Sequence, residues 1–134
     1  MGMKTVKVAI AFVASLLVSS GPVLAHHATG FAYDTKNPIT LKGTVTQFEW
    51  ANPHVKIYFD MTDDQGTVRH WACETMSPSK LSRKGWAPDS LKTGDAITIT
   101  MDPSRNGASS GYVERIVLAN GNVLNTKDTA GRQQ

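Results

Sequence analysis

The sequence predicts an all-β domain, a small five- to six-stranded OB-like Greek-key barrel with one short helix between strands three and four. Short runs of apolar and β-branched residues alternate with turn residues over positions 40–124. Gly43 lies within the first run, at a place where a barrel strand can bend. A helix pattern at residues 77–85 separates the third run from the fourth, which is the order of an OB barrel. Another small barrel or sandwich is the alternative, since the strand count does not separate the two.

The segment 1–25 has the pattern of an export signal. It has a positively charged start, an apolar run at residues 8–18, and Val23 and Ala25 at the positions that precede signal cleavage. The run is too short to cross a membrane, which takes about 20 apolar residues. We therefore expect cleavage after Ala25, a periplasmic or secreted protein, and no membrane span after cleavage.

The exported part is expected to form one domain with little net charge. Lys4 and Lys7 belong to the signal, and removing two lysines from a net charge of +3 leaves about +1. This removes the compositional argument for nucleic acid as a partner, and we expect none. The remaining length of about 100 residues fits a single domain. Its expected parts are an extended N-terminal arm at 26–39, the barrel at 40–124 and a flexible polar tail at 125–134.

The expected second strand alternates strictly between apolar and polar residues. Its apolar side pairs best with the third strand when Phe59 lies opposite Trp71. A slip of one residue would place His70 against Phe59 and expose Trp71. The other opposed pairs of this register are Ile57 with Cys73, Asp60 with His70, and Lys56 with Glu74. The expected strands lie at 40–50, 54–62, 68–74, 96–101 and 112–118, and Asn120-Gly121 predicts a final hairpin into 123–124.

The expected helix at 77–85 has a defined start and end. Pro78 suits the first turn after a capping Ser77, and Gly85 suits the position after the last turn. Trp86 is placed to fold back over the end of the helix. We interpret the basic residues of the helix as a solvated end that complements the helix dipole, with docking of an anionic partner as the alternative. These residues are Lys80, Arg83 and Lys84.

The segment Glu49-Trp50-Ala51-Asn52-Pro53-His54 (E-W-x-N-P-H), together with Ala25-His26-His27, carries a resemblance. The chain is similar to an uncharacterised family of small exported bacterial proteins, known only as a domain of unknown function. The resemblance implies export and a small β-barrel, and it implies no established activity. Members usually hold another residue at the position of Cys73, which implies that this thiol is not a required ligand. Further matching segments are residues 43–48, 71–74, 77–78, 83–86 and 89–95.

The histidines at the processed end form the first candidate site. Cleavage after Ala25 would give His26 an α-amine with a pKa of about 8, which can deprotonate and bind a metal near neutral pH. The amine and Nδ1 of His26 form a chelate suited to copper before zinc. His27 and His54 are the expected additional ligands, and His70 is a further option. The alternative is a solvated tail that binds copper weakly and incidentally.

The segment from Glu49 to His54 and the neighbouring strand form the second candidate. A carboxylate, an aromatic wall, an amide and an imidazole at the barrel mouth would suit a ligand or partner protein, because OB barrels bind through such loops and strand faces. The alternative is structural: Asn52-Pro53 makes a corner, Trp50 covers the edge of the core and Glu49 bonds backbone amides. The residues of this face are Glu49, Trp50, Asn52, Tyr58 and His70.

These residues favour a binding module over an enzyme, because they form no recognisable catalytic constellation. Cys73, the only cysteine, is expected to pack as a small buried hydrophobe. We expect a non-enzymatic periplasmic binding module with copper as the candidate ion at His26. The rival hypothesis is a protein-interaction or structural barrel of the cell envelope without a metal site. Its partner would be a periplasmic protein or small ligand that the sequence does not identify.

Overall fold

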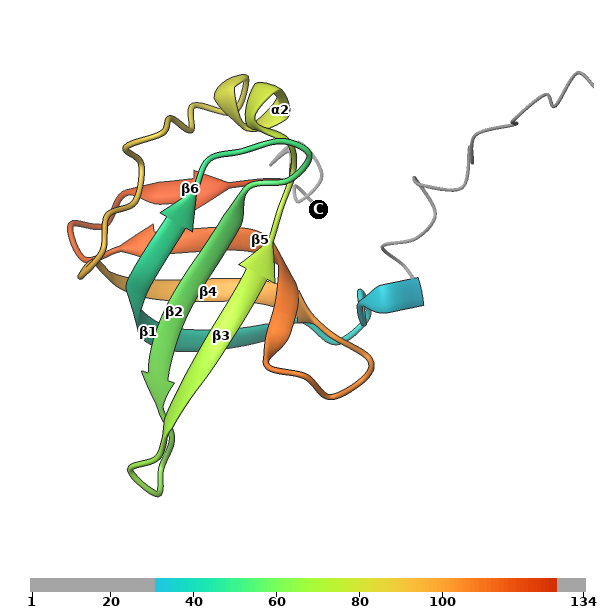
Figure 1. Cartoon of the computed structure of the whole chain (residues 1–134), viewed down its shortest axis with the longest axis vertical. Coiled ribbons are helices and arrows are strands. Elements are labelled where there is room, and N and C mark those ends of the chain that lie inside the picture. Colours follow the sequence, from blue (N-terminus) through green and yellow to red (C-terminus); the bar gives the residue numbers. More distant parts are fainter. Residues whose placement is uncertain (1–30, 128–134) are drawn as a thin grey trace, which may run out of the picture.

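The computed structural model describes residues 31–127 and shows a closed β-barrel with one short helix (Figure 1). The sheet order is β3-β2-β1-β4-β5-β6, and an additional pairing of β3 with β5 closes the barrel. That pairing is parallel, whereas the others are antiparallel, as in an OB fold. The predicted fold class is therefore confirmed. The elements are β1 (Ile39–Glu49), β2 (Lys56–Thr62), β3 (Val68–Glu74), α2 (Pro78–Ser82), β4 (Ala96–Pro103), β5 (Ser110–Leu118) and β6 (Val123–Asn125).

The long strand β1 belongs to both sides of the barrel. Residues 39–44 pair with β4, and residues 44–49 pair with β2 across a bulge. Gly43 lies at this change of partner, where an added Cβ would come within 2.5 Å of the Asp60 carbonyl oxygen. The predicted bend thus needs glycine for a close backbone approach.

The register predicted for β2 and β3 is confirmed throughout. Phe59 pairs with Trp71, and their rings stack with centroids 6.0 Å apart. The polar partners Asp60 and His70 lie opposite each other on the outer side. Alternation of apolar and polar residues was sufficient to predict this register, because each of the two strands has one buried face.

The core is built from the inner faces of the strands and is covered at one end by α2 and the segment that follows it. Leu81 and Trp86 are buried there, and the Trp86 indole donates a hydrogen bond of 2.9 Å to the Asn125 carbonyl. Figure 1 shows α2 beyond the turn that joins β1 to β2. The other buried apolar residues are Val45, Val55, Ile57, Phe59, Cys73, Leu91, Ile97, Ile99, Met101, Val113 and Ile116.

The helix is shorter than the expected 77–85, because hydrogen-bonded turns replace its last residues. Pro78 occupies the first turn as expected, and Gly85 has a φ of +85°. Ser77 accepts hydrogen bonds from backbone amides through its carbonyl, and its side chain makes no cap. β4 and β5 extend beyond the expected 96–101 and 112–118 because Asp102 and Pro103 continue to pair with β5.

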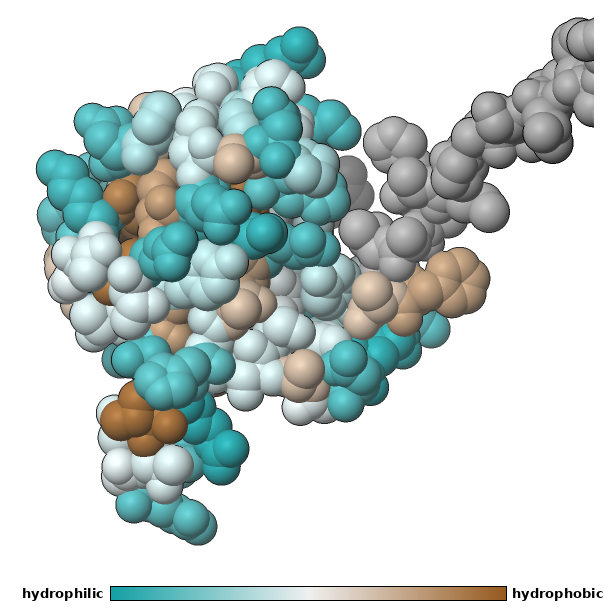
Figure 2. Space-filling model, viewed as in Figure 1, coloured by the Kyte–Doolittle hydropathy of each residue, from teal (hydrophilic) through white to brown (hydrophobic). Residues whose placement is uncertain are grey.

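The surface on the side of Figure 2 is mostly hydrophilic. A small apolar spot lies on the protruding hairpin between β2 and β3, where Val68 is 51% exposed. No helix within residues 31–127 is long and apolar enough to cross a membrane.

Candidate functional site

Three side chains from distant parts of the sequence meet where β3 ends. The Tyr33 hydroxyl donates to Glu74 Oε1 at 2.7 Å, and His54 Nδ1 lies 3.2 Å from Glu74 Oε2. One carboxylate therefore joins the N-terminal arm to the segment before β2. We call Tyr33, His54 and Glu74 the arm-end cluster.

His54 is held in place by the buried residue that follows it. The Val55 side chain is fully buried, and its backbone exchanges hydrogen bonds with the segment after β3, at 3.0 Å to the Met76 carbonyl and 2.9 Å from the Thr75 amide. The corner expected at Asn52-Pro53 precedes it, and the peptide bond between these two residues is cis. Buried Val55 thus holds the backbone of His54 in place, and 44% of the His54 side chain is exposed.

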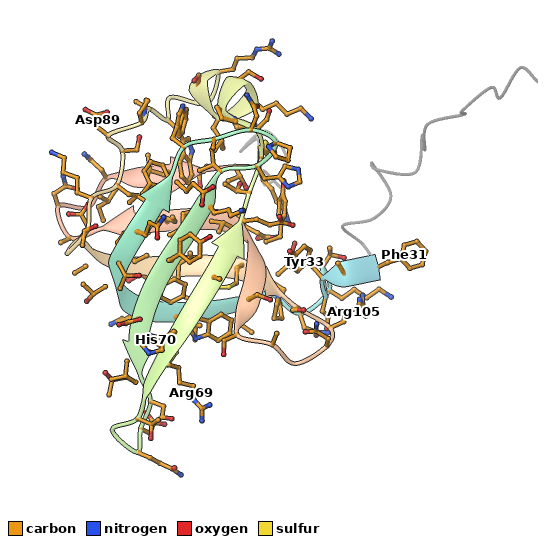
Figure 3. All side chains as sticks on the ribbon, in the orientation of Figure 1. Phe31, Tyr33, Arg69, His70, Asp89 and Arg105 are labelled. Carbon is orange, nitrogen blue, oxygen red and sulfur yellow. The ribbon has the colours of Figure 1, made fainter. Side chains whose placement is uncertain are left out.

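Tyr33 is held by backbone contacts of the arm to the loop between β4 and β5. The Asp34 amide donates to the Pro103 carbonyl at 2.8 Å, and Arg105 Nε donates to the Tyr33 carbonyl at 3.0 Å. The Tyr33 ring lies against Tyr112, with centroids 5.9 Å apart. Burial, and then the hydrogen bond to Glu74, raise the pKa of Tyr33, so this phenol stays protonated. Figure 3 shows Tyr33 beside Arg105 at this edge, with Phe31 pointing away from the barrel.

The contact to Glu74 has a chemical consequence for His54. When Nδ1 carries the hydrogen and donates a hydrogen bond to the carboxylate, Nε2 has a free lone pair. A carboxylate on one ring nitrogen is the usual arrangement of a histidine that binds a metal through the other nitrogen. The arm-end cluster therefore presents one oriented imidazole at the surface.

His70 forms a similar pair at the other end of the same strands. Its Nδ1 lies 2.6 Å from Asp60 Oδ1, and its side chain is 79% exposed. His70 and Glu74 are four positions apart along β3, a distance of about 13 Å at strand spacing. The structure thus does not bring His70 and His54 together, although sequence analysis considered both for one site.

The outer face of β1 and β2 satisfies its own polar groups. Glu49 accepts a hydrogen bond of 3.4 Å from the Tyr58 hydroxyl, and Lys56 Nζ lies 3.8 Å from its other oxygen. Within residues 31–127, the Glu49 carboxylate therefore contacts side chains, whereas the structural alternative expected it to bond backbone amides. Trp50 is half-buried against Phe48, with ring centroids 5.9 Å apart, as expected for a residue that covers the core edge.

The remaining candidates give no complete metal site in residues 31–127. This part of the chain holds no group of three or more His, Cys, Asp or Glu side chains arranged to bind an ion. His26 and His27 lie outside the described residues. Asn52 is exposed at the corner. Cys73 is buried, and burial raises the pKa of its thiol to about 12, so it is a poor nucleophile and ligand near neutral pH.

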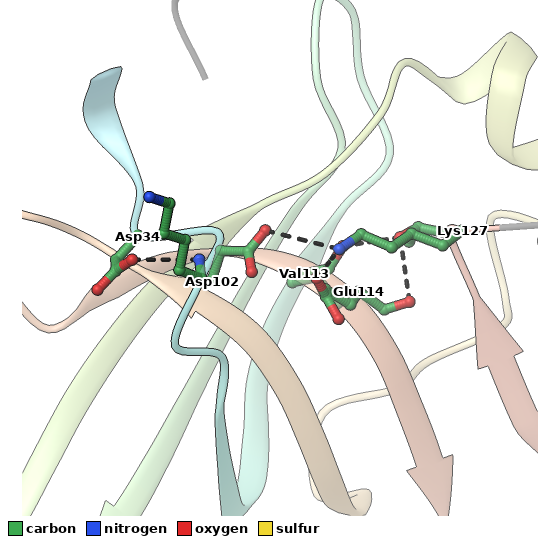
Figure 4. A network of polar contacts seen from close by, with 7 residues as sticks. Asp34, Asp102, Val113, Glu114 and Lys127 are labelled. Carbon is green, nitrogen blue, oxygen red and sulfur yellow. Dashed lines mark hydrogen bonds and ion pairs between the residues drawn. The ribbon is translucent and has the colours of Figure 1, made fainter. Parts of the chain in front are cut away.

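A second polar network, which was not predicted from the sequence, lies on β4 and β5 (Figure 4). Lys127 binds Glu114, and its Nζ lies 3.9 Å from Asp102 Oδ2. The Asp102 side chain is only 4% exposed, and burial raises its pKa, although Lys127 opposes this shift. Thr126, expected in a flexible tail, is buried and donates to the Val113 carbonyl at 2.9 Å.

The chain belongs to a family of unknown function, DUF6152, whose model matches residues 13–114. The predicted resemblance to an uncharacterised family is confirmed to that extent. No curated protein matches the sequence.

Two crystal structures of the mitochondrial single-stranded DNA-binding protein Rim1 of S. cerevisiae resemble the barrel. The first is 11% identical with a TM-score of 0.48, and the match covers 69% of this chain and 98% of that chain. The second is 12% identical with a TM-score of 0.45, covering 62% and 94%. The absence of a nucleic-acid partner stays a prediction.

Proposed function

We propose that this member of a family of unknown function is an exported, non-enzymatic binding module that holds a copper ion between its processed N-terminus and His54. One observation carries the proposal. Glu74 bonds both His54 and Tyr33, so the arm that leads back to His26 starts beside an oriented imidazole. Export is supported by the signal pattern of residues 1–25.

The length of the arm allows this arrangement. An extended chain advances about 3.4 Å per residue, so the stretch from His26 to Tyr33 can span up to about 24 Å. His54 and Tyr33 share a single carboxylate, which makes the required span far shorter than this limit. His26 can therefore reach Nε2 of His54 while Tyr33 keeps its contacts.

The ligand types favour copper. The α-amine and Nδ1 of His26 would bind together with Nε2 of His54, and His27 is an additional imidazole on the same arm. Nitrogen sites bind Cu(II) more tightly than the other divalent first-row metals, including zinc. Glu74 would orient His54, as carboxylates behind metal-bound histidines do.

The test compares the chain that begins at His26 with the same chain carrying one added glycine. Cu(II) affinity is measured by competition with a chelator of known affinity. We expect a dissociation constant well below about 1 μM for the processed chain and at least a hundredfold weaker binding after extension. Micromolar or weaker binding by both chains would refute the proposal.

A protein-interaction module is the second candidate, favoured by the open outer face of β1–β3. Gln47 and Ala72 are exposed on either side of the half-buried Tyr58. This hypothesis expects that the wild-type protein captures a specific periplasmic partner and that Tyr58→Ala loses it. Failure of the wild type to capture a partner would count against it, whatever the copper titration shows.

A further inference from the structure

A basic groove lies between α2 and the end of the described chain. It has a volume of about 450 Å³ and brings together residues that are far apart in the sequence. Its lining residues are Met76, Lys80, Arg83, Lys84, Thr126 and Lys127. The basic groove and the arm-end cluster share no residue.

The charge of the groove is all of one sign. Four of the lining side chains are cationic, and none is acidic. Lys127 forms ion pairs with Glu114 and Asp102, whereas neither Lys80 nor Arg83 has an ion pair among residues 31–127. Cations that converge on one concave surface raise the local potential and favour an anion there.

The basic side chains are not needed to end the helix. The Leu81 carbonyl accepts from the Lys84 and Trp86 amides, and the Ser82 carbonyl accepts from the Gly85 amide. Backbone amides therefore satisfy these two carbonyls at the end of the helix. This weakens the interpretation of Lys80 and Arg83 as residues that only complement a helix end.

Two of the lining residues, Met76 and Thr126, carry no charge. Met76 is half-buried and packs against the core. Thr126 is buried, and its hydroxyl already donates to the Val113 and Glu114 carbonyls. The groove thus offers cations beside the apolar Met76 side chain, which suits a ligand with both an anionic group and an apolar part.

We propose that the basic groove binds a small organic phosphate, with the phosphoryl group on Arg83 and Lys80 and an apolar group over Met76. The planar fork of arginine matches two phosphate oxygens, and lysine adds a compact charge. The volume lies within the range of about 300–1,000 Å³ found for small-molecule sites.

The ligand class is tested by titrating the full processed chain, with a metal chelator present, while amide shifts are followed by NMR. Phenyl phosphate is the probe, with inorganic phosphate and benzyl alcohol as its charged and apolar parts. We expect saturable binding of phenyl phosphate that is at least about tenfold tighter than that of either part. Shift changes should gather at residues 80–84 and 126–127.

The site is tested by a pair of charge-matched double variants. Lys80→Gln with Arg83→Gln should weaken phenyl phosphate binding at least about tenfold. Lys42→Gln with Lys92→Gln removes the same charge from exposed positions outside the groove and should change affinity less than about twofold. The circular dichroism spectrum shows whether each variant keeps its fold.

Three results would overturn the proposal. These are unsaturable binding, equal weakening by both double variants, and binding only to vesicles that contain phosphatidylglycerol. The last would assign the groove to a lipid surface and exclude a free ligand. Copper plays no part in this experiment, so its outcome is independent of the metal proposal.

Discussion

The two ends of the ladder formed by β2 and β3 carry the same pair of groups in different settings. At the arm end, His54 contacts Glu74, which also binds Tyr33, a residue 41 positions away in the sequence. At the hairpin end, His70 contacts Asp60 on the adjacent strand and is largely exposed. Figure 3 shows His70 and Arg69 on the part of the hairpin that protrudes from the barrel.

A histidine–carboxylate pair is therefore not by itself a binding site. The hairpin pair is local, and its turn is held by Asp63, which accepts from the Gln65 and Thr67 amides. The arm-end pair joins three segments and rests on buried Val55. A ligand gains affinity where its contacts are already ordered, because less conformational entropy is lost on binding.

The largest difference in the loss of unfolding free energy is expected between alanine substitutions at two glycines. Gly111, where β3 meets β5, has no space for a side chain, because an added Cβ would lie 2.6 Å from Met101 Sδ and 2.8 Å from the Asp102 carbonyl. Gly111→Ala should cost about 3 kcal/mol of unfolding free energy. Gly66 in the hairpin turn has a φ of +80° in open space, so Gly66→Ala should cost about 1 kcal/mol. Urea denaturation measures both, and equal losses would contradict this difference.

Two valines give the next comparison. Val55 is fully buried at the arm end, whereas Val68 is 51% exposed at the hairpin end. Val55→Ala should lower the free energy of unfolding by about 2 kcal/mol, since it leaves a cavity. Val68→Ala should change it by less than about 0.5 kcal/mol. Urea denaturation of the two variants measures these changes. A large loss of unfolding free energy in Val68→Ala would contradict the prediction that the hairpin contributes little to stability.

A smaller loss of unfolding free energy is expected when the hydrogen bond between Tyr33 and Glu74 is removed. Tyr33→Phe removes the 2.7 Å hydrogen bond to Glu74 and should cost about 1 kcal/mol, because the carboxylate loses a donor. Tyr58→Phe, the control, removes a longer bond of 3.4 Å and should cost less than about 0.5 kcal/mol. Amide hydrogen exchange at Asp34 and Arg105 should accelerate only in Tyr33→Phe. Unchanged exchange there would mean that the tyrosine does not hold the arm.

The smallest effect concerns the titration of two aspartates. Hydrogen bonds from the Thr67 amide, and then from the Gln65 amide and Arg69, lower the pKa of Asp63 below 3.8. The ionised Asp63 carboxylate therefore stabilises the fold above its unfolded-state pKa, and this stabilisation is lost as pH falls through its folded-state pKa. Burial raises the pKa of Asp102, so its cost to the fold sets in as pH rises through the unfolded pKa. Carboxyl NMR titration should place Asp63 below and Asp102 above the ordinary value. The reverse order would contradict these assignments.

The sequence predicts those features of the fold that depend on local periodicity and on turn residues. Alternation in β2 and β3 determines their register, and Pro78 and Gly85 bracket the helical segment. The contact of Tyr33 with Glu74 was not predictable in this way, because the arm has no period and the partners are 41 residues apart. Lys127 and Thr126 were missed for the same reason, since a polar segment gives no signal of burial. Asp102 follows an apolar strand and is buried only because β4 continues to pair with β5.

The most direct test of the account is the Cu(II) affinity of two histidine variants of the chain that begins at His26. His54→Gln and His70→Gln each remove one imidazole that faces a carboxylate, at opposite ends of the same two strands. Loss of a metal ligand should weaken binding at least about tenfold in His54→Gln, whereas His70→Gln should stay within about twofold of the wild type. Equal affinities in the two variants would contradict a copper site at the arm end.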